Sequence, residues 1–246
     1  MLWFRTKHMV LGWAIMSKIF SVRPEFKETK MFCEPIVPAF TVVAQWYKDI
    51  PIVKDLKINP SGAVGTNIKH CTPFLEAMTA GYTLVLSDDI LVEIENGFPK
   101  LSWRTHKTQV TEHSPDQYRG FAPPVGYHPH VFKWVNEFFI KLPDGYSLWC
   151  THPVNQFQLP FQVISGFVDA DSHPLSIQFP FFMQSDWTGI IESGTPLAQL
   201  IPVKRDSWKL QVEPVNEDLT AMSRREYASK IVRSYKNRYW HKKSYK

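Results

Sequence analysis

An acidic turn in the C-terminal half of the chain carries the residues best suited to chemistry. Asp169 and Asp171 flank Ala170, directly after an apolar run that begins at Phe161. A carboxylate held within hydrogen-bond reach of a water molecule can act as a general base or orient that water. Carboxylates in such a turn also accept hydrogen bonds from backbone N–H groups, which is a purely structural role. The sequence leaves both roles open, and if the protein is an enzyme we predict that Asp169 is the base.

Histidines concentrate in the middle of the chain, where six of the nine fall between residues 106 and 173. His128 and His130 stand two residues apart, a spacing that places two side chains on one face of a strand, where they could hold one metal ion. Glu137 is too distant in sequence for a cupin-type site, and Pro129 is expected to interrupt the strand. The alternatives are a metal site at His128 and His130 and a loop with solvent-exposed histidines.

The three cysteines, Cys33, Cys71 and Cys150, include no Cys-x-x-Cys pair, which argues against a zinc knuckle. Such a sparse set is typical of free thiols in a reducing compartment. Cys71 and Cys150 are also candidate nucleophiles, with His70 or His152 beside them in sequence. Neighbouring residues of a strand point to opposite faces, so His70 is poorly placed to activate Cys71. We therefore expect buried, structural cysteines.

Short strands joined by turns must position these side chains. Aromatic residues make up 14% of the 246 residues and there are 19 prolines, a composition that favours strands with irregular connections over long helices. Residues 106–130 are expected to form a loop. Closely spaced strands with turn signals between them indicate a sandwich or barrel. Strands are expected over residues 82–86, 90–94, 101–104, 131–141, 146–151, 161–168, 175–183, 189–191 and 198–203.

Two helical segments carry clear signals, and residues 45–49 are expected to form a short helix or turn that ends at Pro51. The first is a short turn over residues 71–78, with Thr72 as its N-cap and Gly81 as its stop signal. The second is long, from Asp218 to Trp240, with Tyr and Ile residues at every fourth position.

The C-terminal segment is strongly basic. Between Arg224 and Lys246 there are nine Lys or Arg residues against one Glu, and the whole chain has a formal net charge of +5. Basic residues beside Tyr235, Tyr239 and Trp240 could dock on the phosphates of a nucleic acid and stack on its bases. The alternatives are a helix that packs its apolar stripe on the β domain and an arm that reaches a neighbouring subunit.

The chain divides into three parts. Residues 1–16 form an N-terminal extension, whose apolar run is too short to span a membrane and lacks a clear signal-peptide cleavage site. Residues 17–215 form a single β domain with an N-terminal embellishment, and residues 216–246 form the basic helix and tail. No other segment could cross a bilayer, so we expect a soluble protein without a membrane partner.

Three segments of the chain resemble motifs of the trimeric dUTPase and dCTP deaminase family of the β-clip superfamily. These segments are Thr79–Leu84, Gly166–Asp171 and Gly194–Ile201, and they occur in the order of the family. The resemblance implies a mainly β protein with a distorted antiparallel barrel or jelly-roll, followed in this chain by a C-terminal α-helix. It also implies a homotrimer with active sites between subunits.

The resemblance extends to individual residues of the family's site. Asp169 matches the aspartate that contacts the deoxyribose and serves the attacking water. A nucleotide in this site would bring Mg²⁺ with it, and no other cofactor is expected. Five further residues in or beside the motifs are expected to bind the ligand, namely Tyr82, Gly166, Asp171, His173 and Gln199.

Several positions depart from the family pattern. Ser172 and His173 follow the acidic turn, where the family has a Tyr that stacks on the base. Thr83 replaces an Asp that helps to hold metal-bound phosphates, and residues 152–156 replace the Arg-Ser-Gly phosphate cradle. The Gly-rich C-terminal arm is absent. These departures argue against ordinary dUTP hydrolysis, because a triphosphate needs several hydrogen-bond donors.

The whole chain also resembles a family of uncharacterised proteins encoded by tailed phages, through Ile68–Thr79, Gly189–Pro196 and Tyr235–Trp240. This resemblance implies a viral origin and the cytoplasm of an infected host cell, with association with the virion left open. We interpret the chain as a dUTPase-like protein with a degenerate nucleotide or small-ligand site that binds dUTP rather than hydrolysing it. The alternatives are a non-enzymatic phage structural or host-interaction protein that uses the same barrel for assembly and, more distantly, a metal-dependent cupin-like enzyme.

Overall fold

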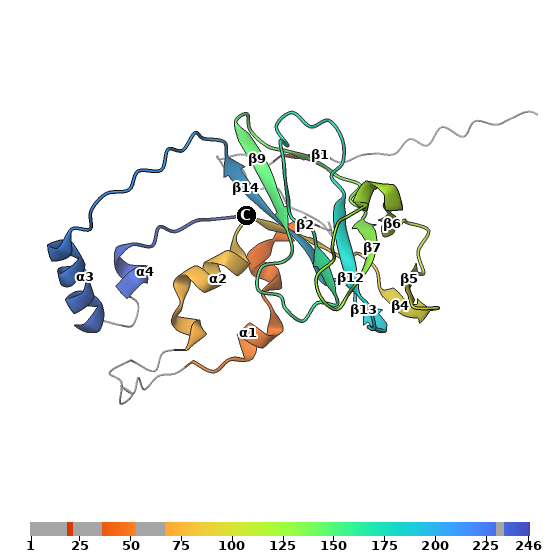
Figure 1. Ribbon diagram of the computed structural model, residues 1–246, viewed down its shortest axis with the longest axis horizontal. Helices are drawn as coiled ribbons and strands as arrows, with labels where there is room; N and C mark the ends of the chain where they lie inside the picture. The colour runs from red at the N-terminus through yellow and green to blue at the C-terminus, as the bar shows by residue number, and fades with distance from the viewer. Residues whose placement is uncertain (1–18, 22–35, 53–66, 230–233) are drawn as a thin grey trace, which may run out of the picture.

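The computed structural model describes residues 19–21, 36–52, 67–229 and 234–246. Within them the chain is mainly β, as predicted, and its strands form four sheets (Figure 1). The predicted N-terminal extension, residues 1–16, lies outside the described residues. Pairing is antiparallel throughout these sheets except between β1 (Ile19–Ser21) and β8 (Phe139–Lys141), which run parallel.

The largest sheet has five strands and carries three of the predicted site residues, Tyr82, Gly166 and Gln199. Its central strand, β14 (Pro196–Lys204), pairs with β9 on one side and with β3 on the other. Neither edge strand of this sheet pairs with a further described strand. The strand order is β11 (Gly166–Val168), β9 (Tyr146–Thr151), β14, β3 (Tyr82–Val85) and β2 (Ile36–Pro38).

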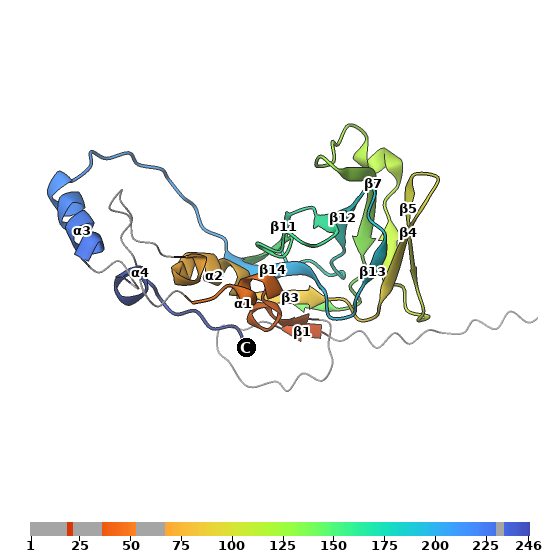
Figure 2. The ribbon, with the colours of Figure 1, turned by 90° about the horizontal axis from the view of Figure 1, so that it is seen from below.

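Two further antiparallel sheets complete the β domain. One has four strands, in the order β10 (Phe161–Val163), β12 (Phe179–Gln184), β7 (Tyr127–Trp134) and β6 (Val110–Glu112). The other has three strands, in the order β13 (Gly189–Ile191), β4 (Ile90–Glu95) and β5 (Phe98–Trp103). Figure 2 shows this three-stranded sheet at the end of the domain opposite α1 and α2.

One hydrophobic core joins these sheets. The ring of Trp134 stacks on that of Phe181 with 3.9 Å between centroids, and the ring of Phe161 meets Trp134 edge-on at 5.0 Å. All three side chains are fully buried, and the same core includes Leu84 of the five-stranded sheet and Ile90 of the three-stranded sheet. Burial of large aromatic side chains is a dominant source of stability.

No closed barrel is found among the described residues, and the distorted barrel or jelly-roll implied by the resemblance stays a prediction. The strands of the described residues form separate sheets with unpaired edge strands, and no run of pairings closes into a ring. The coarser prediction, a mainly β and antiparallel protein with helices at its C-terminal end, is confirmed.

Two predicted segments have different boundaries in the structure. The expected strand over residues 131–141 is divided into β7 and β8, because the side chain of Asn136 accepts a hydrogen bond from the N–H of Phe138 at 3.1 Å and donates one to its carbonyl at 3.0 Å. Such a side-chain turn replaces strand pairing. The expected loop over residues 106–130 contains β6, a 3-10 helix over Pro115–Tyr118 and the first half of β7.

Two short helices, α1 (Gln45–Asp49) and α2 (Thr72–Thr79), lie against one end of the five-stranded sheet (Figures 1 and 2). The predicted N-cap at Thr72 is wrong: Thr72 is the first helical residue, and the cap position makes no side-chain hydrogen bond. Gly81 follows the helix with φ +69°, and a Cβ there would overlap the carbonyl oxygen of Leu200. The chain therefore enters β3 through a position that only glycine fits.

Two helices are described within and beside the predicted helix from Asp218 to Trp240, namely α3 (Glu217–Ser229) and α4 (Ser234–Arg238), and residues 230–233 lie outside the described residues. Both helices stand apart from the sheets, and the chain end then returns to them (Figure 1). The ammonium group of Lys243 lies 2.6 Å from a carboxylate oxygen of Glu76, and the ring of Tyr245 meets that of Tyr82 with 6.1 Å between centroids. No helix among the described residues is long and apolar enough to cross a membrane.

Candidate functional site

The acidic turn leaves the edge strand β11 directly after Val168. The N–H of Ala170 donates to the carbonyl of Val168 at 2.8 Å, which closes a tight turn. The carbonyl of Asp169 accepts the N–H groups of Ser172 at 3.0 Å and His173 at 2.9 Å. The turn is therefore held by its own backbone, and the carboxylates of Asp169 and Asp171 are available to other partners.

Asp171 is a buried carboxylate with an arginine partner. Arg205 donates from Nη1 to Oδ1 of Asp171 at 2.9 Å, and its Nη2 contacts Oδ2. Oδ2 also accepts the backbone N–H of Gly145 at 2.9 Å, and the ammonium group of Lys141 donates to the carbonyl of Asp171. The side chain of Asp171 is only 7% exposed. Its main role is therefore structural, because it connects the acidic turn to Arg205 and to the turn that precedes β9.

Asp169 shares the same arginine but faces solvent. Its Oδ1 accepts the hydroxyl of Ser147 at 2.6 Å and lies 3.0 Å from Nη1 of Arg205. Its side chain is 63% exposed, in contrast to that of Asp171. One oxygen of Asp169 is thus fixed by the protein, and the carboxylate as a whole can accept hydrogen bonds from a ligand.

Hydrogen bonds within the site hold the pKa of both carboxyl groups below the ordinary value. The hydrogen bond from Arg205 lowers the pKa of Asp171 to about 2, with a smaller contribution from the N–H of Gly145. The hydrogen bond from Ser147, followed by that from Arg205, lowers the pKa of Asp169. The two carboxylates in turn raise the pKa of Arg205. All three groups are charged at neutral pH.

An aromatic surface lies beside Asp169. Phe167 pairs with Trp149 across β11 and β9, and their rings are nearly parallel at 12° with 6.1 Å between centroids. Phe167 faces Trp149, and Asp169 contacts Ser147, which lies two residues from Trp149 on β9. Phe167 and Asp169 therefore lie on the same side of the sheet. Phe167 is 66% exposed. A flat ring beside an ionised carboxylate can stack on a planar ligand whose hydroxyl groups reach the carboxylate.

Within one copy of the chain, the structure brings Asp169, Asp171, Gly166 and His173 together but places Tyr82 elsewhere. Tyr82 and Gly166 occupy the same row of the sheet but are three strands apart, roughly 14 Å at 4.8 Å per strand. Tyr82 is buried, with the carbonyl of Lys246 3.4 Å from its hydroxyl.

Gln199 is also held away from the acidic turn, in the interior of the sheet. Its side-chain N–H groups donate to the carbonyls of Ala77 at 2.9 Å and Ala80 at 2.8 Å, and its side-chain oxygen accepts the N–H of Val154 at 2.9 Å. The side chain is 2% exposed. These contacts give Gln199 a structural role, which is to connect β14 with the end of α2 and with the loop after β9.

Arg205 is the functional residue that the sequence did not indicate. It directly follows β14, and its N–H donates to the carbonyl of Gly145 at 2.8 Å. Only the pairing of β14 with β9, and of β9 with β11, brings it beside the acidic turn. No local motif carries that information.

The histidine pair lies on a strand rather than in a loop. Pro129 does not interrupt β7, which runs through it, so that prediction is wrong. His130 Nε2 lies 3.1 Å from a carboxylate oxygen of Glu112, and the rings of His128 and His130 both lie 4.9 Å from that of Phe98. Among the described residues, no three His, Cys, Asp or Glu side chains gather where they could hold a metal ion.

The two described cysteines have opposite environments. Burial raises the pKa of the Cys150 thiol to about 12, so it is protonated and unsuited to nucleophilic attack. Cys71 is exposed, which corrects the prediction that it is buried. Cys33 lies outside the described residues.

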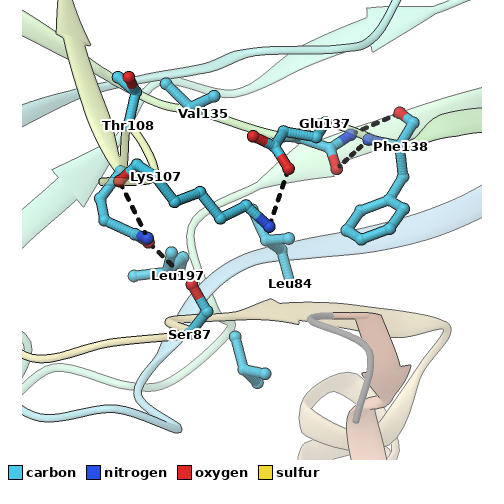
Figure 3. A pocket seen from close by; sticks show the side chains of 11 residues that line it. Leu84, Ser87, Lys107, Thr108, Val135, Glu137, Phe138 and Leu197 are labelled. Atoms are coloured by element: carbon cyan, nitrogen blue, oxygen red, sulfur yellow. Dashed lines mark hydrogen bonds and ion pairs between the residues drawn. The ribbon is translucent and has the colours of Figure 1, made fainter. Parts of the chain in front are cut away.

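A small pocket lies away from the acidic turn, where Ser87 and Leu84 face the segment Val135–Phe138 (Figure 3). Its rim holds an ion pair of 2.8 Å between Lys107 and Glu137. The pocket has a volume of about 20 Å³, which is room for one water molecule. It is too small to be a ligand site.

Neither a known protein family nor a curated protein matches the chain. The dUTPase-like and phage-protein resemblances therefore stay predictions that rest on the motifs of the sequence. The geometry of the acidic turn has to be interpreted from its own chemistry.

Proposed function

We propose that the acidic turn binds a small hydroxylated ligand of nucleoside type without hydrolysing it. The observation that supports this proposal is the pairing of both carboxylates with Arg205, which accompanies the lowered pKa of Asp169 and of Asp171. A general base works best when its pKa lies near the operating pH. The lowered pKa makes Asp169 a weak base, but an ionised and exposed carboxylate is a strong acceptor for a ligand hydroxyl group.

The charge of the turn disfavours a triphosphate as the preferred ligand. Asp169 and Asp171 balance Arg205 and Lys141, so these four groups carry no net charge. A triphosphate needs an excess of cationic or N–H donors, usually with Mg²⁺. Phe167 instead offers an exposed ring for a planar base beside the acceptor. A nucleoside or nucleoside monophosphate therefore fits this surface better than dUTP.

In this proposal the chain is a phage-encoded, dUTPase-like protein with a degenerate site, acting in the cytoplasm of the infected cell. The dUTPase-like jelly-roll, the homotrimer and the viral origin rest on the sequence resemblances. The site itself does not require a trimer, because Asp169, Arg205 and Phe167 belong to one copy. Mg²⁺ would enter only with a bound nucleotide.

The proposal is tested by thermal unfolding of the purified protein with deoxyuridine, dUMP, dUTP and dCTP, each with and without Mg²⁺. A ligand at a hundredfold its dissociation constant stabilises the protein by about 2.7 kcal/mol, a clearly measurable shift. We expect stabilisation that Asp169→Asn abolishes. Asp116→Asn is the matched control, because Asp116 is an exposed carboxylate paired with Arg119 at 2.5 Å, away from this site. Equal shifts in both variants would reject Asp169 as the binding residue.

A second candidate function is non-enzymatic assembly or host interaction. It is favoured by the exposed apolar side chains of residues 208–215, which a single copy leaves in solvent. The basic end of the chain is a further candidate surface for nucleic acid, although Lys243 pairs with Glu76. This second function would be favoured if no ligand shifts the unfolding temperature and the protein self-associates. Salt-sensitive binding to DNA or RNA would indicate that the basic C-terminal segment binds nucleic acid.

A further inference from the structure

The chain between the sheets and α3 carries an exposed strand-like pattern. Trp208, Leu210 and Val212 are 90%, 88% and 90% exposed, and they alternate with the polar residues Lys209 and Gln211. Alternation with a period of two is typical of a strand that buries one face. This segment pairs with no described strand. An apolar stripe of this kind is rarely left in solvent unless it is an interaction surface.

The helix that follows presents a second uncovered apolar stripe. The side chain of Asn216 accepts the N–H of Leu219 at 3.1 Å, which caps the start of α3. Two acidic residues in its first turn further favour the helix. Leu219 and Met222 lie three residues apart on one side of the helix and are 62% and 60% exposed. Strand segment and helix thus form a unit, residues 206–229, which we call the arm.

We propose that the arms of two copies of this chain pair with each other. Residues 207–215 of the two copies form an antiparallel two-stranded ribbon around a two-fold axis at Gln211. The α3 helices pack their apolar stripes on the apolar face of this ribbon. Such an interface is self-complementary, because each copy contributes the same surface. A two-stranded ribbon alone is marginal in water, and the helices supply the layer that it needs.

One register of the ribbon keeps all apolar side chains on one face and also pairs opposite charges. Registers that place Leu210 opposite a polar residue are excluded, because they put apolar side chains on both faces. A register centred on Lys209 would place two ammonium groups opposite each other, and registers centred on Leu210 or Val212 would leave Lys209 without a carboxylate opposite it. The register centred on Gln211 instead places Lys209 opposite Glu213 of the second copy, twice, and Leu210 opposite Val212. Opposite charges and apolar pairs facing each other across two strands are both stabilising.

The available apolar area suits a stable dimer. A buried aromatic side chain covers about 150–250 Å², and a buried Leu, Val or Met covers about 60–120 Å². Trp208, Leu210, Val212, Leu219 and Met222 together therefore contribute roughly 500 Å² from each copy. With Val215, which is 72% exposed, the total approaches about 1,200 Å², the lower limit for a specific interface.

The arm lies apart from the sheets, so two arms can pair without a change in the β domain. The chain leaves the sheet after Lys204, at the end of β14, and returns to it through the contact of Tyr245 with Tyr82. Figures 1 and 2 both show α3 apart from the sheets. The arm contains no residue of the candidate site at Asp169. Pairing of the arms and ligand binding at Asp169 can therefore be tested independently.

Cysteine cross-linking of the full chain tests the register. In a background with Cys33 and Cys71 changed to Ser, Gln211→Cys places two thiols on the two-fold axis. Directly opposed residues have Cα atoms about 4.5–5.5 Å apart, within the range of a disulfide. The control is Ser207→Cys, whose two copies would be about 26 Å apart along the ribbon. We expect a covalent dimer for Gln211→Cys and little for Ser207→Cys. Equal cross-linking of both, or of neither, would overturn the register.

Charge reversal tests the pairing in solution, with sedimentation equilibrium as the readout. Lys209→Glu and Glu213→Lys each create two like-charge pairs, and each should weaken the dimer about tenfold. The double variant restores both ion pairs and should return the dissociation constant to within about threefold of the parent value. A parent chain that is monomeric at 100 μM, or a trimer that these variants leave unchanged, would overturn the proposal. All variants lie in an exposed segment, and circular dichroism checks that the β domain is folded.

Discussion

Replacement of Gln199 by Leu should destabilise the fold strongly. The substitution keeps the side-chain volume but removes three hydrogen bonds of 2.8–2.9 Å, to the carbonyls of Ala77 and Ala80 and from the N–H of Val154. A buried polar group left without a partner costs about 1–3 kcal/mol. Burial of the leucine side chain returns about 1–2 kcal/mol. Three unpaired groups at about 1.5 kcal/mol each, less about 1.5 kcal/mol returned by the leucine, give an expected net loss of about 3 kcal/mol, a large part of the roughly 5–15 kcal/mol that usually stabilises a domain.

Urea unfolding followed by tryptophan fluorescence measures this loss as a shift of the midpoint at constant slope. Gln162→Leu is the matched control, because Gln162 is half-buried and its side chain makes one long hydrogen bond of 3.5 Å to the carbonyl of Val163. The control should change stability by less than about 1 kcal/mol. A Gln199→Leu variant as stable as this control would refute the structural role of Gln199. Its resemblance-based role as a ligand residue would then regain support.

Three further predictions follow from the same structure. Gly81→Ala should lower the free energy of unfolding by about 2–4 kcal/mol, measured by thermal unfolding. Gly97→Ala is the control, because Gly97 has a similar positive φ but open space around it, and it should lower the free energy of unfolding by about 1–2 kcal/mol. Equal losses would contradict the close packing at Gly81. Cys150, whose pKa is raised to about 12, should resist alkylation at pH 8 until urea unfolds the protein, and rapid labelling of the native protein would disprove its burial. Because the folded pKa of Asp171 is depressed from 3.8 to about 2, its pairing with Arg205 stabilises the fold above about pH 4 and is lost as the pH falls towards 2. Arg205→Met should therefore move acid unfolding to higher pH, and an unchanged acid midpoint would contradict the pairing.

The sequence predicted the elements whose signals are local. Turn residues and β-rich runs located β3, β4, β9, β13 and β14, because strand alternation and turn chemistry act over a few residues. The break at Asn136 was missed, since its effect depends on side-chain hydrogen bonds to Phe138 that an apolar run conceals. The distorted barrel or jelly-roll stays a prediction of the resemblance, because the arrangement of sheets depends on strand pairings between distant residues that no local signal carries.

In the candidate site, too, the sequence indicated residues that are close along the chain and missed one that is brought in by strand pairing. Asp169 and Asp171 could be recognised together because only Ala170 lies between them. Arg205 could not, since it reaches them only through the pairing of β14 with β9 and of β9 with β11. Tyr82 was grouped with Asp169 by motif resemblance, yet two strands, β14 and β9, lie between Tyr82 and β11 in one copy. Motif order along a chain therefore does not establish which residues share a site.

Isothermal titration calorimetry with deoxyuridine, dUMP and dUTP tests the central claim most directly, because one experiment reports both binding and turnover. We predict a saturable binding heat for at least one nucleoside or monophosphate, no sustained heat of hydrolysis with dUTP and Mg²⁺, and loss of binding in Asp169→Asn. Sustained heat from dUTP that Asp169→Asn abolishes would show that Asp169 is a catalytic base, and the binding-only account would be wrong. Absence of any binding heat would equally contradict the account, and the function would then lie in assembly through the arm.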